Sequence, residues 1–348
     1  MNVCYIITSA INAGPVNVLF NMLDECINNF SIKPWLICLE NDIPANRSIR
    51  NKFRNLGVHV VQFNIKDIDK IVSFIKENNI KVVHSHGLKP DLLNLMIKIR
   101  TRNGLFNCST LHNFPYEDYV PLFGKVKGRL LATLHVLISK KLYSIACSRS
   151  IQDKYKEIGI DTDLVENGVK FPEIIGDKRI KSGRKFLYVG ELIKRKNLTF
   201  LIKIFKNLPE FDLTIVGDGV DYDFLREISL ESNNIHFQGR IENPTRYYQE
   251  TDYYISASLS EGLPMSILEA LSFGKPLLLS DIPAHRSIIN EGENGELFKL
   301  TDHDIVEKIN EITKENFDSK SIYETAKKYY SSYAMTRHYK KIYMENLR

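Results

Sequence analysis

Short apolar runs rich in β-branched residues alternate with amphipathic segments along almost the whole chain. The runs are continuous rather than alternating in polarity, which is typical of parallel strands covered by helices on both faces. In the first half we predict strands at residues 3–8, 35–39, 58–63, 81–84, 108–111 and 144–147. The amphipathic segments between them predict helices at residues 16–29, 88–102 and 122–142.

A second series of apolar runs follows residues 169–184, a stretch without clear periodicity that we interpret as a linker. We predict its strands at residues 185–189, 212–216, 235–237, 253–256 and 276–279. The pattern therefore predicts an α/β protein of two doubly wound domains that face a cleft, with boundaries at 1–170 and 171–330. Helical spacing from Ser319 onward predicts one long closing helix.

The composition is that of a soluble globular protein, with 43% hydrophobic and 26% charged residues in 348. A net charge of +5 is too small for this length to indicate a nucleic-acid partner. The longest nearly unbroken apolar run, residues 130–138, is too short to cross a bilayer, and the first ten residues predict a strand rather than a signal peptide. The five cysteines form no CxxC pair, so we expect buried thiols in a reducing cytoplasm.

In doubly wound sheets, ligands bind beyond the carboxyl ends of the strands, often at helix N-termini. Gly190 permits a sharp turn after the strand predicted at 185–189, and Arg195 and Lys196 stand at the start of the next helix. Cations are unfavourable there unless an anion binds between them and the backbone amides. These residues therefore indicate an anion site, and two solvated surface charges are the alternative.

Two further loops of the second half carry glycine directly after a strand. Gly217 and Gly219 permit a tight turn in TIVGDGV, which by itself is explained equally well by turn chemistry. Gly239 and Arg240 follow the strand at 235–237, where exposed backbone could pair with a planar base.

The stretch SEGLPMSILEALSFGKP, residues 260–276, carries one glutamate before a helix and one inside it. Pro264 suits the first helical position, so Glu261 lies in the loop and Glu269 more than a turn into the helix. The two are therefore not an adjacent acid pair. A diphosphate at the helix N-terminus, with hydroxyl groups donating to both carboxylates, would explain the pattern. The alternative is a helix-start charge and a partly buried structural acid.

The run SASLSEGLPMSILEALSFGKPLLLSDIPAHRSII resembles the donor-site signature of retaining glycosyltransferase family four, including the spacing of its two glutamates. VGELIKRKN, IVGDGV, HFQGRIEN and VENGV resemble the other markers of that family, and SAINAGPVNVLFNML, VVHSHG and TLHN fit less specifically. The resemblance covers nearly the whole chain. It implies the GT-B architecture, with a C-terminal helix closing back on the first domain at about residues 330–348. It also implies a nucleotide-diphosphate-sugar donor, UDP favoured and GDP the alternative, and retention at the anomeric carbon.

The resemblance also implies roles for single residues of the second half. Lys196 would neutralise the donor diphosphate, Glu261 would hold hydroxyls of the transferred sugar, and Glu269 would hold the nucleotide ribose. Arg240 would lie near the base. The remaining donor contacts would come from the loop positions Gly190, Arg195, Gly217, Gly239, Gly262, Leu263, Pro264 and Met265.

In the first half, the resemblance implies that Gly14 and Pro15 let the first loop approach the diphosphate. His112 matches a cleft histidine that we count with Lys196 and Glu261 as catalytic. Asn167, next to Gly168, matches the asparagine–glycine element on the acceptor side.

One position departs from the pattern of the family. Many members carry arginine directly after the first-loop glycine, and here that residue is Glu191. We expect Arg195 to supply the second positive charge of the diphosphate clamp.

No carboxylate is evidently placed as a covalent nucleophile. We therefore expect attack from the leaving-group face, with the departing phosphate accepting the proton of the acceptor hydroxyl, a mechanism implied by the family. Four Asp-x-Asp triplets lack flanking ligand-like residues, so we expect neither a catalytic metal nor a cofactor. We expect His84 and His86 to lie on alternate faces of their strand, which argues against a shared metal. His86 is an expected acceptor contact, with a turn role as the alternative.

The predicted helix at 122–142 is apolar with a basic face. Its cations are Lys125, Lys127, Arg129, Lys140 and Lys141. Such a helix can lie on an anionic bilayer or meet a lipid diphosphate, and an ordinary solvated face is the alternative. Members of the family often glycosylate lipid-linked acceptors. With a Lys-, Asn- and Ile-rich composition that suits an AT-rich bacterium, this indicates a cytoplasmic or peripheral membrane enzyme that makes capsule or lipopolysaccharide glycans.

Two other functions share this architecture. A non-hydrolysing UDP-sugar 2-epimerase would need its own catalytic acids, and EGLPMSILEA argues against it. A catalytically silent, glycosyltransferase-like partner subunit is disfavoured by the intact Lys196, Glu261 and Glu269, although Glu191 supports it slightly.

Overall fold

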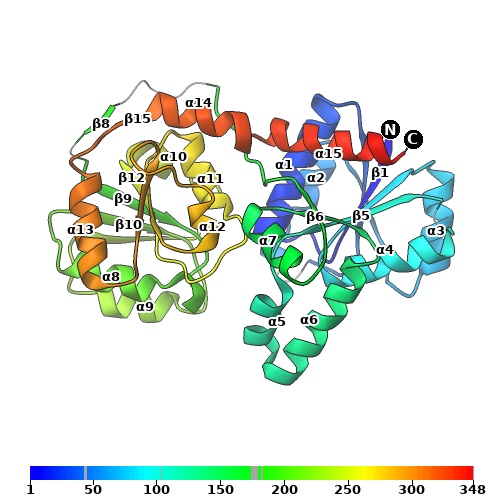
Figure 1. The fold of residues 1–348 in the computed structure, drawn as a ribbon, viewed down its shortest axis with the longest axis horizontal. Helices are drawn as coiled ribbons and strands as arrows, with labels where there is room; N and C mark the ends of the chain where they lie inside the picture. The colour runs from blue at the N-terminus through cyan, green and yellow to red at the C-terminus, as the bar shows by residue number, and fades with distance from the viewer. Residues whose placement is uncertain (43–44, 103, 174–178, 182, 348) are drawn as a thin grey trace. The chain divides into compact units, whose positions relative to one another are not determined.

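A computed structural model describes residues 1–42, 45–102, 104–173, 179–181 and 183–347 (Figure 1). The chain divides into two compact units. The first unit comprises Met1–Gly168 and Ser332–Arg348, and the second comprises Val169–Ser331. We predicted this division after residues 170 and 330, within two residues of the observed boundaries. Each unit is described by itself below.

The first unit is built on a parallel sheet with helices on both of its faces, in the strand order β3-β2-β1-β4-β5-β6-β7. Its strands are β1 (Asn2–Ile7), β2 (Lys33–Cys38), β3 (His59–Gln62), β4 (Val82–His86), β5 (Phe106–Leu111), β6 (Tyr143–Ala146) and β7 (Asp163–Leu164). Its helices are α1 (Gly14–Asn28), η1 (Ala45–Arg47), α2 (Arg50–Asn55), α3 (Ile68–Glu77), α4 (Leu88–Arg100), α5 (Pro115–Phe123), α6 (Lys125–Ser139), α7 (Arg149–Glu157) and α15 (Ser332–Asn346).

The second unit repeats this plan with the strand order β11-β10-β9-β12-β13-β14. Its strands are β9 (Lys185–Val189), β10 (Asp212–Val216), β11 (Ile235–Gly239), β12 (Tyr253–Ser256), β13 (Leu277–Ser280) and β14 (Gly295–Phe298), with β8 (Arg179–Lys181) and β15 (Asn316–Asp318) as a separate antiparallel pair. Its helices are η2 (Lys194–Lys196), α8 (Leu198–Lys206), α9 (Tyr222–Ser229), α10 (Thr245–Glu250), α11 (Met265–Ser272), α12 (Pro283–Arg286), α13 (Asp302–Ile312) and α14 (Ser319–Tyr330).

The central strands are apolar and buried on both faces, as the continuous runs predicted. All of β12 and β13 is buried, as is β1 beyond its first residue. The five cysteines are buried and free. The chain reverses its direction of winding between β1 and β4, and again between β9 and β12. Ligands of open α/β sheets bind at such switch points, so the loops that follow these four strands are the first places to look for a site.

The helix predicted at 122–142 is present as α6, but it begins three residues later and ends three residues earlier. Gly124, whose φ of +80° favours glycine, separates it from α5, a helix that the sequence did not predict, and the two helices form a hairpin. The two helices approach closely at Gly128, where a Cβ atom would lie 2.4 Å from the backbone oxygen of Tyr119. A glycine at that position therefore sets the contact between α5 and α6.

The predicted closing helix is also divided, into α14 of the second unit and α15 of the first. Ser331 between them is extended, because the backbone there pairs with another segment: the N–H of Val169 donates to the oxygen of Tyr330 at 2.9 Å. The prediction that the C-terminal end packs on the first domain is confirmed, since Tyr339 and Tyr343 of α15 are buried there.

The predicted linker at 169–184 contains β8, while residues 174–178 and 182 lie outside the described parts.

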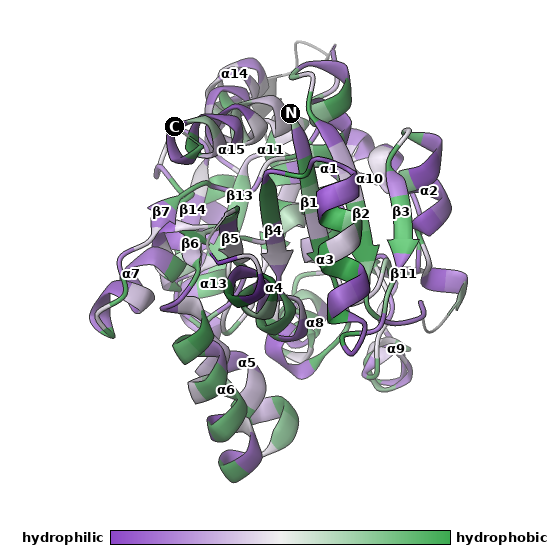
Figure 2. Cartoon of the chain, turned by 90° about the vertical axis from the view of Figure 1, so that its right-hand side faces the viewer, coloured by the Kyte–Doolittle hydropathy of each residue, from purple (hydrophilic) through white to green (hydrophobic). Residues whose placement is uncertain are grey.

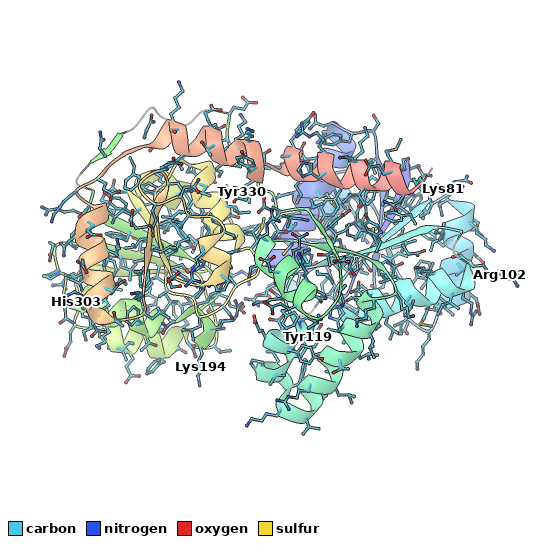
Figure 3. All side chains as sticks on the ribbon, in the orientation of Figure 1. Lys81, Arg102, Tyr119, Lys194, His303 and Tyr330 are labelled. Carbon is cyan, nitrogen blue, oxygen red and sulfur yellow. The ribbon has the colours of Figure 1, made fainter. Side chains whose placement is uncertain are left out.

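A buried polar network fastens the α5–α6 hairpin to the sheet. Asp91 of α4 accepts a hydrogen bond from the hydroxyl of Ser109 (2.7 Å), and its other oxygen lies 2.8 Å from Nε2 of His135 on α6. Nδ1 of His135 contacts the hydroxyl of Tyr119 at 2.9 Å. Tyr119 lies on α5 and is labelled in Figure 3. The Asp91 side chain is 0% exposed, so its oxygens depend on these partners for hydrogen bonds.

We expect His135→Leu to lower the free energy of unfolding by about 3–5 kcal/mol, because it leaves a buried carboxylate without its partner. Urea denaturation measures this change. The matched control is His236→Leu, which removes a histidine from an exposed pair with Asp212. Equal effects of the two substitutions would contradict the role given to the Asp91–His135 pair.

Candidate active site

Two loops leave the second sheet on either side of its switch point. One follows β9 and leads through η2 into α8, and the other follows β12 and leads into α11. The N–H of Leu259 donates to the backbone oxygen of Arg195 at 2.9 Å, which ties the two loops together. The loops bring together three residues that the sequence singled out separately: Arg195, Lys196 and Glu261.

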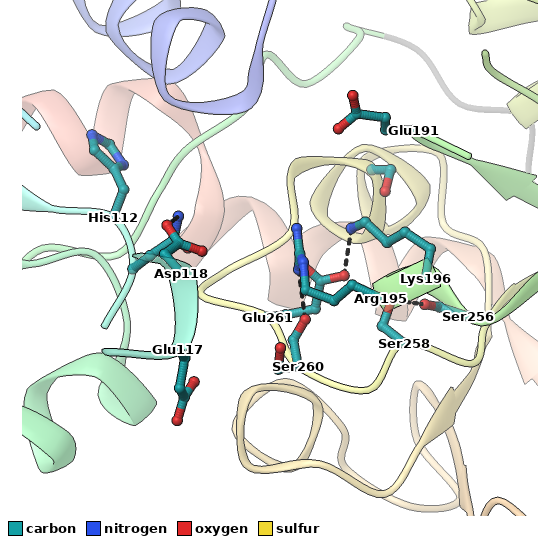
Figure 4. A network of polar contacts seen from close by, with 12 residues as sticks. His112, Glu117, Asp118, Glu191, Arg195, Lys196, Ser256, Ser258, Ser260 and Glu261 are labelled. Atoms are coloured by element: carbon teal, nitrogen blue, oxygen red, sulfur yellow. Dashed lines mark hydrogen bonds and ion pairs between the residues drawn. The ribbon is translucent and has the colours of Figure 1, made fainter. Parts of the chain in front are cut away.

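Glu261 is bound by both cations (Figure 4). Nη1 of Arg195 donates to Oε2 of Glu261 at 2.9 Å and to the backbone oxygen of Ser260 at 2.6 Å. Nζ of Lys196 donates to Oε1 of the same carboxylate. The side chain of Glu261 is 6% exposed, whereas that of Arg195 is 38% exposed. The carboxylate is thus enclosed, and the guanidinium reaches the surface of the unit.

The charges of these neighbours decide the protonation state of Glu261. Burial alone would raise the pKa of this carboxyl, but the positive charges of Lys196 and Arg195 outweigh burial and lower it to about 2. Glu261 is therefore ionised at neutral pH. Two cations thus converge at this loop, and such paired cations suit an anionic ligand.

A second layer of buried residues supports the Glu261 loop, and the sequence reasoning missed it. The hydroxyl of Ser258 hydrogen-bonds to the Glu261 carboxylate. The backbone oxygen of Ser258 accepts from the hydroxyl of Ser280 at 2.7 Å, and Nδ1 of His285 lies 2.8 Å from the backbone oxygen of Ser280. All three residues are 0% exposed. No local sequence pattern predicts these contacts, because they join loops that are distant in sequence.

Glu269 occupies a different environment. Its Oε2 accepts a hydrogen bond from the hydroxyl of Tyr248 on α10 at 2.8 Å. Burial raises the pKa of Glu269 to about 6, although the bond from Tyr248 acts in the opposite direction. Glu261 and Glu269 thus have separate partners and opposite pKa shifts. The sequence had no signal for Tyr248.

Helix α11 starts between the two glutamates. It begins at Met265, so Pro264 is its N-cap residue rather than its first helical residue, a correction of one position. The hydroxyl of Ser266 is 2.8 Å from that of Tyr254 on β12, which fixes the first turn on the sheet. The first amides of an α-helix have no acceptor within the helix, and their dipoles favour an anion.

The loops after β9, β10 and β11 contact one another through backbone. A Cβ atom on Gly217 would lie 1.8 Å from the oxygen of Gly190, so only glycine fits there. The N–H of Gly217 donates to the oxygen of Gly239 at 2.8 Å. Arg240 follows directly and is exposed. These predicted donor-loop residues therefore line one edge of the sheet.

Glu191, which stands where the family has arginine, is exposed. Its backbone oxygen accepts from the hydroxyl of Tyr188 at 3.0 Å, while its carboxylate is drawn apart from the ion pairs of Glu261 (Figure 4). Arg195 is the residue that joins Lys196 in the cluster.

In the first unit, His86 ends β4 and His112 follows β5. Nδ1 of His86 lies 2.9 Å from Nε2 of His112, and Nε2 of His86 has no hydrogen-bond partner among the residues described. The expectation that His84 and His86 lie on alternate faces is wrong, because residues two apart in a strand share a face. Their rings stack with centroids 4.5 Å apart.

The three histidines are neutral at physiological pH. Burial lowers the pKa of His84 to about 3 and that of His112 to about 4, and it lowers the pKa of His86 as well. His84 is held by the hydroxyls of Thr110 (2.7 Å) and Tyr343 (2.6 Å). The stack therefore rests on α15, and His112 is its most exposed member.

The other predicted residues of the first unit lie in three places. Gly14 and Pro15, predicted in the loop after β1, are exposed residues of the first turn of α1. Asn167 is buried at the end of the unit, and its N–H donates to the oxygen of Cys147 at 3.3 Å. Lys125, Lys127 and Arg129 are exposed on α6.

Across the described ranges, no three His, Cys, Asp or Glu side chains are grouped as metal ligands would be. No helix in the described part of the chain is both long and apolar enough to span a bilayer.

Comparison with known proteins matches residues 170–329 to the family model of glycosyl transferases group 1. The O-antigen biosynthesis glycosyltransferase WbnH of Escherichia coli is 29% identical over 96% of this chain and 97% of its own. The UDP-Gal:alpha-D-GlcNAc-diphosphoundecaprenol alpha-1,3-galactosyltransferase of Escherichia coli is 27% identical over 80% of this chain and 79% of its own.

Among solved structures, Anabaena HepE in complex with UDP-glucose superimposes with a TM-score of 0.79 at 15% identity, covering 99% of this chain and 100% of HepE. That likeness extends over both units and shows the fold. The chain is therefore a glycosyltransferase of the GT-B fold, and its residues 170–329 match the glycosyl transferases group 1.

Proposed function

We propose that this enzyme transfers a sugar from a UDP-sugar to a glycan or lipid-linked acceptor, with retention, in the synthesis of a bacterial surface polysaccharide. The observation that carries the proposal is the Arg195–Lys196–Glu261 cluster at the switch point of the second sheet. The relatives support the substrate classes, since one is named for O-antigen synthesis and another for UDP-galactose and a diphosphoundecaprenol acceptor. HepE was solved with UDP-glucose. A GDP-sugar is the second choice of donor.

The cluster can bind two parts of such a donor, the diphosphate and the sugar. Lys196 and Arg195 would turn from Glu261 toward the diphosphate, whose oxygens accept charge-assisted hydrogen bonds. The carboxylate of Glu261 would then accept hydrogen bonds from hydroxyls of the sugar. Glu269, more than a turn into α11, would accept from the ribose hydroxyls. The first amides of α11, near Met265, would face the phosphates between the two glutamates.

The transfer step balances without a further reagent. The bond between the anomeric carbon and the phosphate oxygen breaks, and that oxygen keeps the electron pair. The acceptor oxygen bonds to the anomeric carbon from the same face, and its proton passes to the departing phosphate. Lys196, Arg195 and the helix amides stabilise the charge that develops on the leaving group. These positive groups support a reaction that needs neither a catalytic metal nor a cofactor.

On the acceptor side we assign His112 the contact with the reacting sugar. It is the most exposed histidine of the stack, and burial keeps it neutral, so it can donate or accept a hydrogen bond. His86 would orient the ring of His112 through the 2.9 Å contact. Asn167 remains an acceptor-side prediction. We place the enzyme in the cytoplasm, at the inner face of the cell membrane.

The purified protein, incubated with a panel of UDP-, GDP- and ADP-sugars, tests this function. We expect slow release of nucleoside diphosphate from one donor without acceptor, and faster release with a lipid-diphosphate-linked sugar. The anomeric proton coupling of the product reports retention, and EDTA reports metal independence. An epimerised donor, or donor binding without turnover, would overturn the proposal in favour of an epimerase or a silent subunit.

We expect Glu261→Gln to reduce turnover at least a hundredfold, because it removes a transition-state contact and disorders the two cations. It also removes stability. The folded-state pKa of about 2 lies below the ordinary 4.5, so the ionised form contributes about 3 kcal/mol above pH 4.5, which is lost as pH falls toward 2. Urea denaturation at pH 7 measures this loss. Glu250→Gln, at an exposed pair with Arg246, is the control.

We expect Glu269→Gln to have the opposite effect on stability. A folded-state pKa of about 6 lies above the ordinary 4.5, so this acid favours folding below pH 4.5 and costs about 2 kcal/mol once pH exceeds 6. The variant should therefore be more stable than wild type at pH 7 and similar at pH 4.5. Its KM for the donor should rise about tenfold through loss of a charged hydrogen bond. An unchanged KM would remove Glu269 from the donor site.

A further inference from the structure

The α5–α6 hairpin projects from the first unit and shows hydrophobic segments along its length (Figures 1 and 2). Large apolar side chains on it are exposed to solvent, and we call them the apolar ridge. Its members, with their exposed fractions, are Leu122 (71%), Phe123 (47%), Val126 (86%), Leu130 (70%), Leu134 (41%) and Leu137 (55%). Single exposed apolar residues are normal on a protein surface, but a contiguous group marks an interaction site.

Four members of the ridge lie on one face of α6, and Leu122 and Phe123 lie at the end of α5. At 100° per residue, Val126, Leu130, Leu134 and Leu137 fall within an arc of about 80°. The opposite face, which includes Gly128 and His135, is buried against α5 and the sheet. The core of the first unit therefore packs on one side of α6 and leaves the other without a partner.

Cations border the ridge on both sides. By the same helical spacing, Lys127 lies beyond one edge of the arc and Arg129 beyond the other, while Lys140 and Lys141 follow the end of α6. All four are exposed. Residues 122–141 contain no Asp or Glu, so no acidic side chain of α6 neutralises them. Nζ of Lys127 also lies 5.5 Å from the ring of Phe123, which places charge directly beside apolar surface.

We propose that this hairpin docks on an anionic bilayer, with the apolar ridge inserted at the boundary between headgroups and acyl chains. An interfacial helix has this design: aliphatic side chains enter the bilayer while flanking Lys and Arg extend their ammonium and guanidinium groups to the lipid phosphates. A nucleic acid would use the cations and leave the ridge uncovered. An apolar protein groove would cover the ridge and gain nothing from cations on both edges.

The hairpin is held rigidly enough to present the ridge outward. Asp91, His135 and Tyr119 form the buried network that anchors both of its helices, and Gly128 lets α5 cover the inner face of α6 closely. The bilayer therefore meets a fixed surface and does not have to order a flexible segment. The inference does not depend on the donor chemistry, and vesicle binding is measured apart from nucleotide release.

Flotation of the full chain with phosphatidylglycerol-containing vesicles, and with purely zwitterionic vesicles, tests the inference. We expect wild type to bind the anionic vesicles, weakly at high salt, and to leave the zwitterionic vesicles largely unbound. The ridge variant Val126→Ser/Leu130→Ser/Leu134→Ser should lose binding. Its matched control is Val220→Ser/Phe224→Ser/Leu230→Ser, which changes equally exposed apolar residues of the second unit and should bind like wild type.

The charge variant Lys125→Gln/Lys127→Gln/Arg129→Gln should reduce partitioning into anionic vesicles about a hundredfold, because each cation near an anionic surface strengthens binding roughly fivefold. Lys66→Gln/Lys70→Gln/Lys76→Gln changes net charge equally at exposed positions of the first unit and should have a small effect. Thermal midpoints check that all variants fold. Equal binding by the wild type and the ridge variant would overturn the proposal. So would a dimer, seen by light scattering, that the ridge variant abolishes, because a second copy would then cover the ridge.

Discussion

The enclosed ion cluster of Glu261, Arg195 and Lys196 is the constraint on which the second unit depends. A carboxylate that is 6% exposed stays ionised only if cations compensate for its lost hydration, and the two cations of η2, just before the N-terminus of α8, are tolerable only beside an anion. Each group thus requires the other. The loops after β9 and β12 must therefore close on one another, and the layer of Ser258, Ser280 and His285 keeps them closed. Because two cations face this carboxylate, a diphosphate could also bind to positively charged groups of the cluster.

The same unit keeps a second glutamate in an environment that opposes its ionisation. Among the residues that the structure describes, Glu261 has two cations as neighbours, and its pKa falls, while the carboxylate of Glu269 accepts a hydrogen bond from Tyr248, and its pKa rises. Stability alone would not select Glu269, since a neutral side chain would fit that position at lower cost. Functional sites commonly retain such residues at the expense of stability. The contrast between two chemically identical side chains therefore supports a ligand role for the second more strongly than its position in a motif does.

The sequence predicted the sheets well because buried parallel strands need continuous apolar runs, and these are local. It failed where distant contacts decide. The helix break at Ser331 has no Gly or Pro signal, because pairing with Val169 causes it. The short strands β7, β14 and β15 depend on their neighbours in the same way. At the site, the sequence motifs predicted Lys196 and Glu261. The hydrogen bond from Tyr248 to Glu269 could not be predicted, because it joins two helices and neither helix has a sequence pattern that indicates it. The error at His84 and His86 was one of strand geometry, not of missing information.

The break at Gly124 matters most for function. The prediction of one amphipathic helix at residues 122–142 did not include α5, which ends at Phe123 and packs against α6. Folding at Gly124 places α5 against the face of α6 that contains Gly128, so this small-residue face becomes the buried one. The larger side chains of Val126 and Leu130 are then left outside. Hydrophobic periodicity identifies an apolar face but does not say which partner covers it. On α6, Gly128 lets α5 pack against one face. The bulky residues of the opposite face therefore stay exposed, where we propose that the bilayer covers them.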